Sequence, residues 1–328
     1  MKELLLLLAN YPYDSSKKEI ITGLLGNIAD WDSFVKLVNA HGIIALAAYN
    51  IKEAGLEGMV PEEAMAALEN GWMKSMARNA WLAERWKEVN EILNEAGIKH
   101  LLLKGMALEH TIYGSRGLRQ MSDNDFLIRE EEGLYAWKLL QENGFRMIMA
   151  KSPIHKKILP KIHKHLPMLI RDGYPIEIHV NLPGVDFAEK SDYNRIFDEA
   201  VEISVNGTKA FIPPADVHIE YLIKHHAGHE LSGDCQIRTY NDIKLLNADY
   251  KAAFPDEFVN DPNQGKKLRF RKANYRKKVS AMPLIYRVLF LAGDIFPSIT
   301  WMKQRYKCSG FKALFYYPHR MGKLVWLV

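Results

Sequence analysis

The sequence has little of what secreted and membrane proteins carry. Only two cysteines, Cys235 and Cys308, occur among 328 residues, far apart and in no metal-ligand spacing. This argues against a disulfide scaffold and fits a reducing compartment. No apolar run approaches the roughly 20 residues that a helix needs to cross a bilayer. We therefore expect a cytoplasmic protein without a membrane span.

The first ten residues, MKELLLLLAN, also lack the features of a signal peptide. The leucine run is short, Glu3 interrupts the basic region, and no clean small-residue cleavage site follows. We expect the first turns of a buried helix instead. The sequence contains no internal repeat and no low-complexity segment. Its net charge of +5 suits an anionic partner such as a nucleotide, although many proteins share this mild basicity.

The length suggests two or three domains, and the patterning divides the chain into three regions. Residues 1–96 are helical in pattern, with Asp32 as a helix N-cap and Pro61 at a helix start. Residues 97–212 alternate between strand and helix, and residues 213–328 return to helical spacing. The sequence therefore predicts an α+β core flanked by N-terminal and C-terminal helical regions.

Several elements of the core can be placed by residue. A buried strand over 98–103 ends at Lys104-Gly105, and a helix over 106–113 follows. A second strand covers 122–128, a helix covers 130–143, and a strand starts at Phe145. Asp172-Gly173 gives the strongest hairpin signal in the chain. An edge strand at 210–212 and helices over 216–229 and 237–246 complete the prediction.

Three carboxylates stand on the predicted strands. Asp123 and Asp125 are two residues apart, so their side chains leave the same face. Like charges this close repel, and a divalent cation would neutralise them. Glu177 alternates with core residues on the later hairpin strand and shares its face with His179. If the two strands are neighbours, Asp123, Asp125 and Glu177 form a three-carboxylate site for two cations.

This arrangement resembles the polymerase-beta-like nucleotidyltransferase superfamily, and within it a family of uncharacterised bacterial nucleotidyltransferases. The matching residues lie between about 98 and 246. The helical regions on either side carry no specific motif. They are Leu103-Lys104-Gly105, Tyr113, Arg119, Asp123-Asn124-Asp125, Glu177-Ile178-His179, the histidines 225, 226 and 229, Arg238 and Asp242. The resemblance implies a polymerase-beta-like core with a mixed sheet.

Two features depart from the resemblance. The wider superfamily has Gly-Ser or Gly-Gly at the first turn, where this chain has Lys104-Gly105. The resemblance implies that phosphate contacts would then pass to Lys104 or Arg119. The family usually has an apolar residue between its aspartates, where this chain has Asn124. Neither departure removes a metal ligand.

The resemblance implies transfer of a nucleoside monophosphate from a nucleoside triphosphate such as ATP to an unknown acceptor, with release of pyrophosphate. Asp123, Asp125 and Glu177 would be catalytic and would hold Mg²⁺ or Mn²⁺. Lys104, Gly105, Arg119 and His179 would bind the nucleotide, with Gly105 letting the backbone approach phosphate. Arg119 could instead pair structurally with Asp123.

Three alternatives stay open. A protein that kept this fold and lost turnover would bind nucleotide as a regulator. His225 and His229, four residues apart near His226 and Glu230, have a spacing that can bind zinc, although no glutamate follows His225 directly. The basic segment 266–278 contains no acid and could contact nucleic acid, although charge runs are usually solvated surface.

Overall fold

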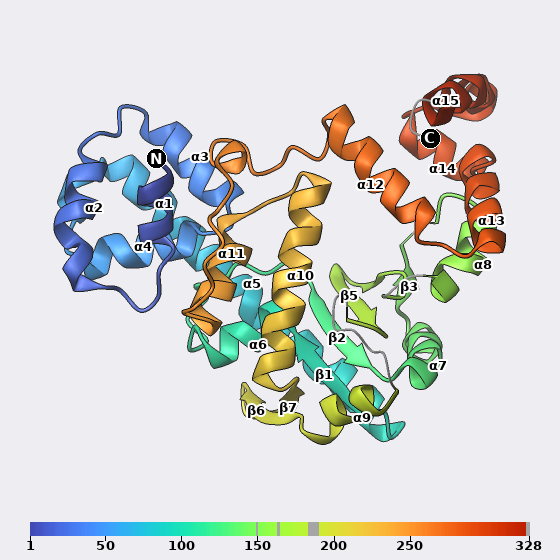
Figure 1. The fold of residues 1–328 in the computed structure, drawn as a ribbon, viewed down its shortest axis with the longest axis horizontal. Coiled ribbons are helices and arrows are strands. Elements are labelled where there is room, and N and C mark those ends of the chain that lie inside the picture. Colours follow the sequence, from blue (N-terminus) through green and yellow to red (C-terminus); the bar gives the residue numbers. More distant parts are fainter. Residues whose placement is uncertain (149, 163–164, 183–189, 326–328) are drawn as a thin grey trace. The chain divides into compact units, whose positions relative to one another are not determined.

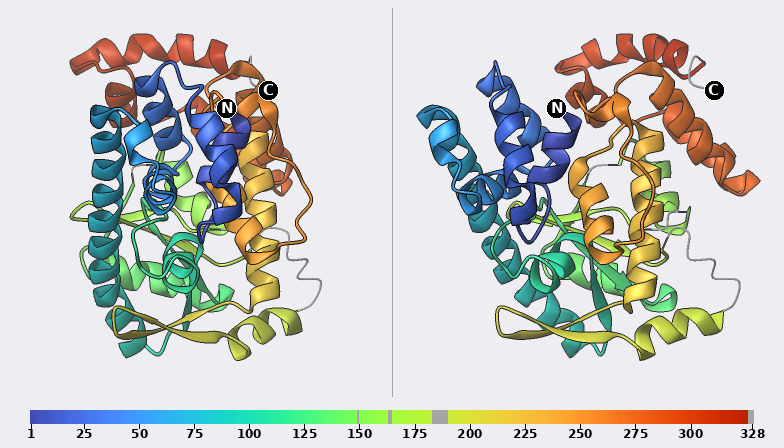
Figure 2. Two further views of the ribbon diagram at one scale, coloured as in Figure 1. Left: turned by 90° about the vertical axis from the view of Figure 1, so that its left-hand side faces the viewer. Right: turned by 60° about the vertical axis from the view of Figure 1, so that its left-hand side comes forward.

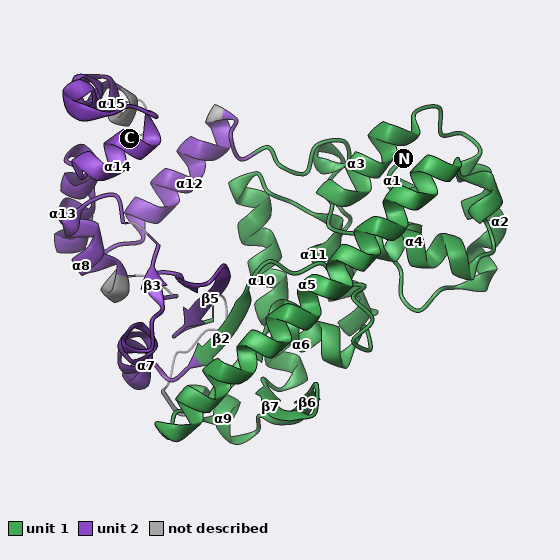
Figure 3. Ribbon diagram, turned by 180° about the vertical axis from the view of Figure 1, so that it is seen from behind, with its two compact units in different colours: residues 1–127, 182–264 green, residues 128–181, 265–328 purple. Residues whose placement is uncertain are grey.

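The computed structural model describes residues 1–328 except 149, 163–164, 183–189 and 326–328. Helices and strands share the chain as predicted, which confirms the α+β class (Figure 1). The chain folds into two compact units (Figure 3). The first comprises residues 1–127 and 182–264, and the second comprises residues 128–181 and 265–328. The three regions predicted from the sequence, with boundaries at 96 and 212, stay a prediction.

The first unit begins with a group of packed helices. Their bounds are α1 Lys2–Leu8, η1 Ser15–Lys17, α2 Lys18–Leu25, α3 Trp31–Ala40, α4 Ile44–Glu53, η2 Glu57–Met59 and α5 Glu62–Glu95. The leucine run forms α1 as expected, with Leu4, Leu5 and Leu8 buried. The N-cap of α3 is Asp30, whose carboxylate accepts from the Ser33 amide, so the assignment of Asp32 as the cap was wrong. Asp32 lies in the first turn, where the negative charge of a carboxylate interacts favourably with the helix dipole.

Helix α5 is 34 residues long, and Figure 2 shows it as a straight rod. Helix α4, buried along most of its length, packs against it. The strands and helices that follow in the first unit are β1 His100–Leu103, α6 Lys104–Thr111, β2 Asn124–Ile128, α9 Lys190–Asp198, β6 Val201–Val205, β7 Thr208–Ile212, α10 Ala215–Ser232, α11 Ile237–Leu246 and η3 Asp256–Phe258. The last residue of β2, Ile128, belongs to the second unit. All residues of β1 and β2 are buried, including the polar Asn124 and Asp125 with which β2 begins.

The second unit contains α7 Glu130–Glu142, β3 Arg146–Met147, α8 Pro153–Ile162, β4 Leu169–Arg171, β5 Tyr174–His179, α12 Leu268–Ser280, α13 Leu284–Ile295, α14 Ile299–Arg305, η4 Gly310–Phe315 and α15 Tyr316–Val325. Strands β4 and β5 pair antiparallel through Asp172 and Gly173, which both have positive φ. The predicted hairpin is therefore confirmed. Helices α8 and α13 pack around Ile158, Met282 and Phe290.

Two sheets are formed. The larger has the strand order β1-β2-β5-β4-β3, and β6 pairs with β7 in a separate two-stranded sheet. Residues 210–212, predicted as an edge strand, belong to this second hairpin instead. Its turn is Asn206-Gly207, again with positive φ at both residues, the conformation that asparagine and glycine tolerate best. Strand β7 packs against β1.

Within the described part of the chain, no single helix is long and apolar enough to cross a membrane. Two pairs of helices, 31–40 with 44–53 and 284–295 with 299–305, reach the required length and apolar composition together, but each pair is bent.

The loop between α6 and β2 lies directly against α5 at Gly117. This residue has φ +69°, and a Cβ there would stand 2.5 Å from the Met76 Cα. We expect Gly117→Ala to lower the free energy of unfolding by about 3 kcal/mol or more, because backbone strain and steric overlap add. Urea denaturation measures this loss.

Gly97→Ala is the matched control, because Gly97 has φ +71° and nothing within 4 Å of its added Cβ. It should lose only the roughly 1–2 kcal/mol of left-handed strain. Equal losses in the two variants would show that the loop moves away from α5 without cost.

Candidate functional site

The turn from β1 into α6 holds the first predicted site residue, Lys104. Its φ is +47°, a left-handed conformation that is uncommon for a residue with a side chain and is concentrated at functional sites. The Lys104 amine lies 2.7 Å from Oδ1 of Asp125, and both side chains are largely buried. A buried carboxylate is costly unless it is paired, and this contact supplies the partner of Asp125.

Gly105 is required by packing. A Cβ at this position would lie 2.6 Å from the Arg119 Nη1 atom and 2.8 Å from the Met121 sulfur. Any larger residue would therefore push Arg119 away. The glycine lets the guanidinium approach the start of α6 at the backbone.

Arg119 pairs with Asp242 of α11, whereas the sequence suggested Asp123 as its structural partner. The Arg119 Nε and Nη2 atoms lie 2.9 and 2.8 Å from Oδ2 of Asp242. The Tyr113 hydroxyl donates to Oδ1 of the same carboxylate at 2.9 Å. All three side chains are buried. Burial, followed by the charge of Asp242, raises the pKa of Tyr113 well above its usual value, so the phenol keeps its proton.

The loop that carries Arg119 is held by its main chain. Glu109 of α6 accepts from the amides of Gly117 and Arg119. Asn79 of α5 donates to the Arg119 carbonyl at 2.9 Å, and Arg238 of α11 donates to the Gln120 carbonyl. Burial raises the pKa of Glu109, and the two amides act in the opposite direction. Helices α5, α6 and α11 thus fix the loop that precedes Asp123 and Asp125.

Asp123 and Asp125 differ in their surroundings. Asp123 lies just before β2, is half-buried and accepts from the Ser122 hydroxyl at 2.9 Å. Asp125 lies inside β2 and is 4% exposed. Between them, the Asn124 amide donates to the Leu82 carbonyl of α5 at 3.2 Å. The polar residue that departs from the family pattern thus ties β2 to the long helix.

In the second unit, β5 places Glu177 and His179 on one face, as predicted. The His179 Nε2 atom lies 3.4 Å from one Glu177 oxygen, and the His165 Nδ1 atom lies 3.5 Å from the other. His179 is buried, and Glu177 is 17% exposed at its side chain. Each Glu177 oxygen therefore lies within ion-pair distance of one imidazole.

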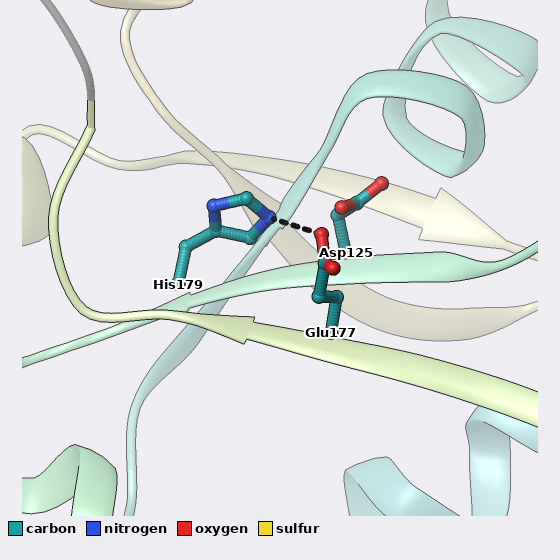
Figure 4. Close-up of side chains that lie close together, drawn as sticks. All are labelled: Asp125, Glu177 and His179. Atoms are coloured by element: carbon teal, nitrogen blue, oxygen red, sulfur yellow. Dashed lines mark ion pairs between the residues drawn. The ribbon is translucent and has the colours of Figure 1, made fainter. Parts of the chain in front are cut away.

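Among the described residues, one group of three side chains could hold a metal ion. The ligand atoms of Asp125, Glu177 and His179 lie within 4.8 Å of one another (Figure 4). Asp123 does not belong to this group. Two carboxylates and an imidazole are common metal ligands, and the imidazole favours a transition metal over Mg²⁺. The residues therefore fit a divalent cation.

The histidines of α10 do not form a second such group in the part of the chain that is described. The His225 and His229 rings do come within 4.4 Å, as their spacing predicts. His226, however, contacts Thr239 at 2.9 Å and the Cys235 sulfur at 3.9 Å. The zinc alternative thus lacks a third converging ligand in these residues.

Sequence reasoning missed three residues of this region: Glu109, Asn79 and His165. The first two act on main-chain groups of a loop, and no spacing in the sequence indicates such contacts. His165 forms an isolated bridge with His179, so the long hairpin pairing could have suggested it. Tyr113 and Asp242 were singled out by the resemblance, but their contact with Arg119 was not.

Comparison with known proteins places most of the chain in a family. A family model described as an uncharacterised nucleotidyltransferase matches residues 27–274. No curated protein and no solved structure matches the chain.

The ion pair between Arg119 and Asp242 should dominate the stability of this region. We expect Asp242→Asn to lower the free energy of unfolding by about 3–5 kcal/mol, because it leaves the Arg119 charge buried without its partner. Tyr113→Phe, the matched control, removes one hydrogen bond to the same carboxylate and should cost about 1 kcal/mol. Both are measured by urea denaturation. Similar small losses would mean that water reaches Arg119.

His218 gives the region a pH dependence. This buried residue of α10 has no hydrogen-bond partner at Nε2 among the described residues, and burial lowers its pKa from 6.5 to about 4. The unfolded chain takes up a proton near pH 6.5 and the folded protein only near pH 4, so acidification between these values favours unfolding.

We expect the wild type to lose up to about 3 kcal/mol more than His218→Gln between about pH 7 and pH 4. Urea denaturation at a series of pH values measures the difference. Parallel stability curves for the two proteins would contradict this account.

Proposed function

We propose, since this chain belongs to the uncharacterised nucleotidyltransferase family, that it moves a nucleoside monophosphate from a nucleoside triphosphate to an acceptor with the help of a divalent cation. The observation that carries the proposal is the convergence of Asp125, Glu177 and His179 within 4.8 Å. The position of Lys104 against Asp125 supports it. The order of the elements, with the Asp-x-Asp pair at the start of β2 and β2 beside β1 and β5, supports a polymerase-beta-like core.

The cation would be held by Asp125 and Glu177, with His179 as a nitrogen ligand and Asp123 as a further carboxylate. Once bound, it would screen the triphosphate and lower the pKa of an acceptor hydroxyl. The two carboxylates also set the selectivity for a cation over an anion. His165 contacts the Glu177 oxygen that His179 does not contact, and would help to orient this carboxylate.

The cationic side chains act on the phosphates. Lys104 lies on Asp125 and would turn to the triphosphate as the carboxylate takes up its cation. Arg119 is anchored through Nε and Nη2 and faces the start of α6 at Gly105 with Nη1. A cation held in this way needs little reorganisation when charge gathers on a leaving group. Asp242 and Tyr113 are positioning residues, because they act through Arg119.

The reaction is a substitution at the α-phosphorus. The acceptor oxygen forms a bond to that phosphorus, the bond from the α-phosphorus to its bridging oxygen breaks, and pyrophosphate leaves. The acceptor proton passes to solvent. The identity of the acceptor is open between a sugar, an amine alcohol, a nucleic-acid end and a protein side chain.

Calorimetric titration with ATP, GTP, CTP and UTP, with Mg²⁺, with Mn²⁺ and without metal, tests the proposal. We expect metal-dependent binding of at least one nucleotide and a loss of about tenfold or more in affinity for Asp125→Asn, because a buried carboxylate ligand is removed. The matched control is Asp172→Asn, which changes a carboxylate in the exposed β4–β5 turn and should leave binding unchanged.

Two further variants separate the possible ligand sets. If His179 is a ligand, His179→Gln should weaken Mn²⁺-supported binding more than Mg²⁺-supported binding. If the three carboxylates alone hold the cation, Asp123→Asn should weaken both and His179→Gln neither. Folded wild-type protein that binds no nucleotide with either metal would refute the proposal. Binding without pyrophosphate release in the presence of any acceptor class would instead favour a regulatory protein that has lost turnover.

A further inference from the structure

Helix α13 of the second unit is apolar on the side that faces solvent as well as on the side that faces the core (Figure 3). Phe290 lies in the core that α13 shares with α8. The opposite side carries residues spaced i, i+1, i+4, i+7, i+8 and i+11, which form one stripe along a helix. All six are apolar: Leu284, Ile285, Val288, Leu291, Ala292 and Ile295. The first three are 73, 63 and 56% exposed, although the outer face of a helix normally carries polar side chains.

Further large apolar side chains are exposed on the elements that follow the stripe. Phe296 is 66% exposed, and Phe311 and Phe315 of η4 are each 81% exposed. The η4 helix packs against α14 and α15, and α15 packs against α13. Single exposed hydrophobic residues are normal at a protein surface, but a contiguous group of them marks an interaction site. The stripe of α13 is such a group.

The chain that forms this surface carries very little negative charge. Residues 262–328 contain fifteen lysines and arginines and a single acid, Asp294. Residues 151–171, which include α8, contain six basic residues and no acid. Asp294 is itself fully buried, where one carboxylate oxygen lies 2.6 Å from the Lys151 amine and 3.3 Å from the Arg320 guanidinium. The helices around the stripe are therefore strongly basic, although the whole chain has a net charge of only +5.

Exposed basic side chains stand close to the stripe along the chain. Helices α12 and α13 are separated only by residues 281–283. Arg271 and Lys277 are exposed on α12, and Arg287 of α13 donates to the Ser280 carbonyl at the end of α12. An exposed apolar helix face beside a cluster of positive charge is typical of helices that lie in the interface of an anionic membrane.

Three kinds of partner could cover this face. A second copy of the chain, bound through the same face, would bring like charges together. Nucleic acid would satisfy the basic residues, but its phosphate backbone offers no apolar surface to Leu284, Ile285 and Val288. An anionic membrane supplies both the negative headgroups and the acyl chains. Helix α13 has 12 residues, too few to cross a bilayer by itself, and this length suits a helix that lies in the membrane surface.

We propose that the exposed stripe of α13 and the basic side chains of α12 together bind the surface of an anionic lipid membrane. The stripe enters the boundary between headgroups and acyl chains, and the lysines and arginines of α12 face the negative headgroups. The family model ends at residue 274, before α13, so the stripe lies outside the part of the chain that the match describes. This binding is additional to the proposed transfer reaction and does not depend on it.

Sedimentation of the full chain with lipid vesicles tests the proposal. Vesicles of phosphatidylcholine mixed with an equal amount of phosphatidylglycerol should bind the wild-type protein. Vesicles of phosphatidylcholine alone should bind it about tenfold or more weakly, because they lack the negative surface potential. Binding to the anionic vesicles should also weaken as the salt concentration rises, since salt screens exposed charges.

The apolar contribution is tested with Ile285→Glu. This variant places a negative charge in the stripe and should weaken binding to the anionic vesicles about tenfold or more. The matched control is Met73→Glu, which introduces the same charge at an apolar residue of α5 that is 58% exposed. The control should bind the vesicles like the wild type.

The charge contribution is tested with the double variant Arg271→Glu and Lys277→Glu. It should also weaken binding about tenfold or more, because two attractions to the headgroups become repulsions. The matched control is Lys36→Glu with Lys74→Glu, which makes the same change of net charge at two exposed lysines of the first unit. A smaller loss in the control would show that position, and not net charge alone, decides the binding.

Circular dichroism establishes that each variant is folded. Equal vesicle binding by Ile285→Glu and Met73→Glu, or equal binding of the wild type to both kinds of vesicle, would overturn the proposal. A wild-type protein that binds no vesicles would overturn it as well. Binding of a fluorescent oligonucleotide that is lost with Arg271→Glu and Lys277→Glu would then identify nucleic acid as the partner. A dimer that Ile285→Glu disperses would identify a second copy. The titration contains neither metal nor nucleoside triphosphate, so its outcome is independent of the transfer reaction.

Discussion

The buried ion pair between Arg119 and Asp242 is the constraint on which the rest of the first unit depends. It joins the loop before β2 to α11, and Tyr113 closes the network from the end of α6. A charge inside a protein is tolerated only where its partner is placed correctly, so the pair fixes the register of both elements. Gly105 and Glu109 then complete the packing around it. This network also positions Asp125, because β2 begins where the loop ends.

The sequence was informative wherever the signal was local. The leucine run, the β1 strand, α7, α10, α11 and the Asp172-Gly173 hairpin were predicted, because periodicity and turn residues act over a few positions. The Asn206-Gly207 turn carries the same kind of signal and should have predicted β6 and β7 together. The N-cap of α3 was predicted two residues too late. Asp30 and Asp32 are both aspartates, a residue type that commonly caps helices, and only the hydrogen bond from the Ser33 amide distinguishes Asp30 as the cap.

The candidate site was less accessible. Asp125, Glu177 and His179 could be chosen because alternation along a strand identifies a shared face. The partner of Arg119 could not be predicted. Asp242 lies 123 positions away in the sequence, and only the folded chain brings it close. The same holds for Asn79 and Glu109, whose contacts are to main-chain atoms. His179 also lies beside the oxygens of Asp125 and Glu177, and an imidazole in such a group would shift its preference from Mg²⁺ toward transition metals.

The manner in which the loop before β2 is held has a consequence for how this chain tolerates change. Glu109, Asn79 and Arg238 bind amide and carbonyl groups, which every residue other than proline carries. The side chains at Arg116 and Gln120 can therefore change without loss of the loop's path. Such changes alter the surface of the loop while its backbone stays fixed. The position of Asp125 is thus insulated from substitutions in the loop that precedes it.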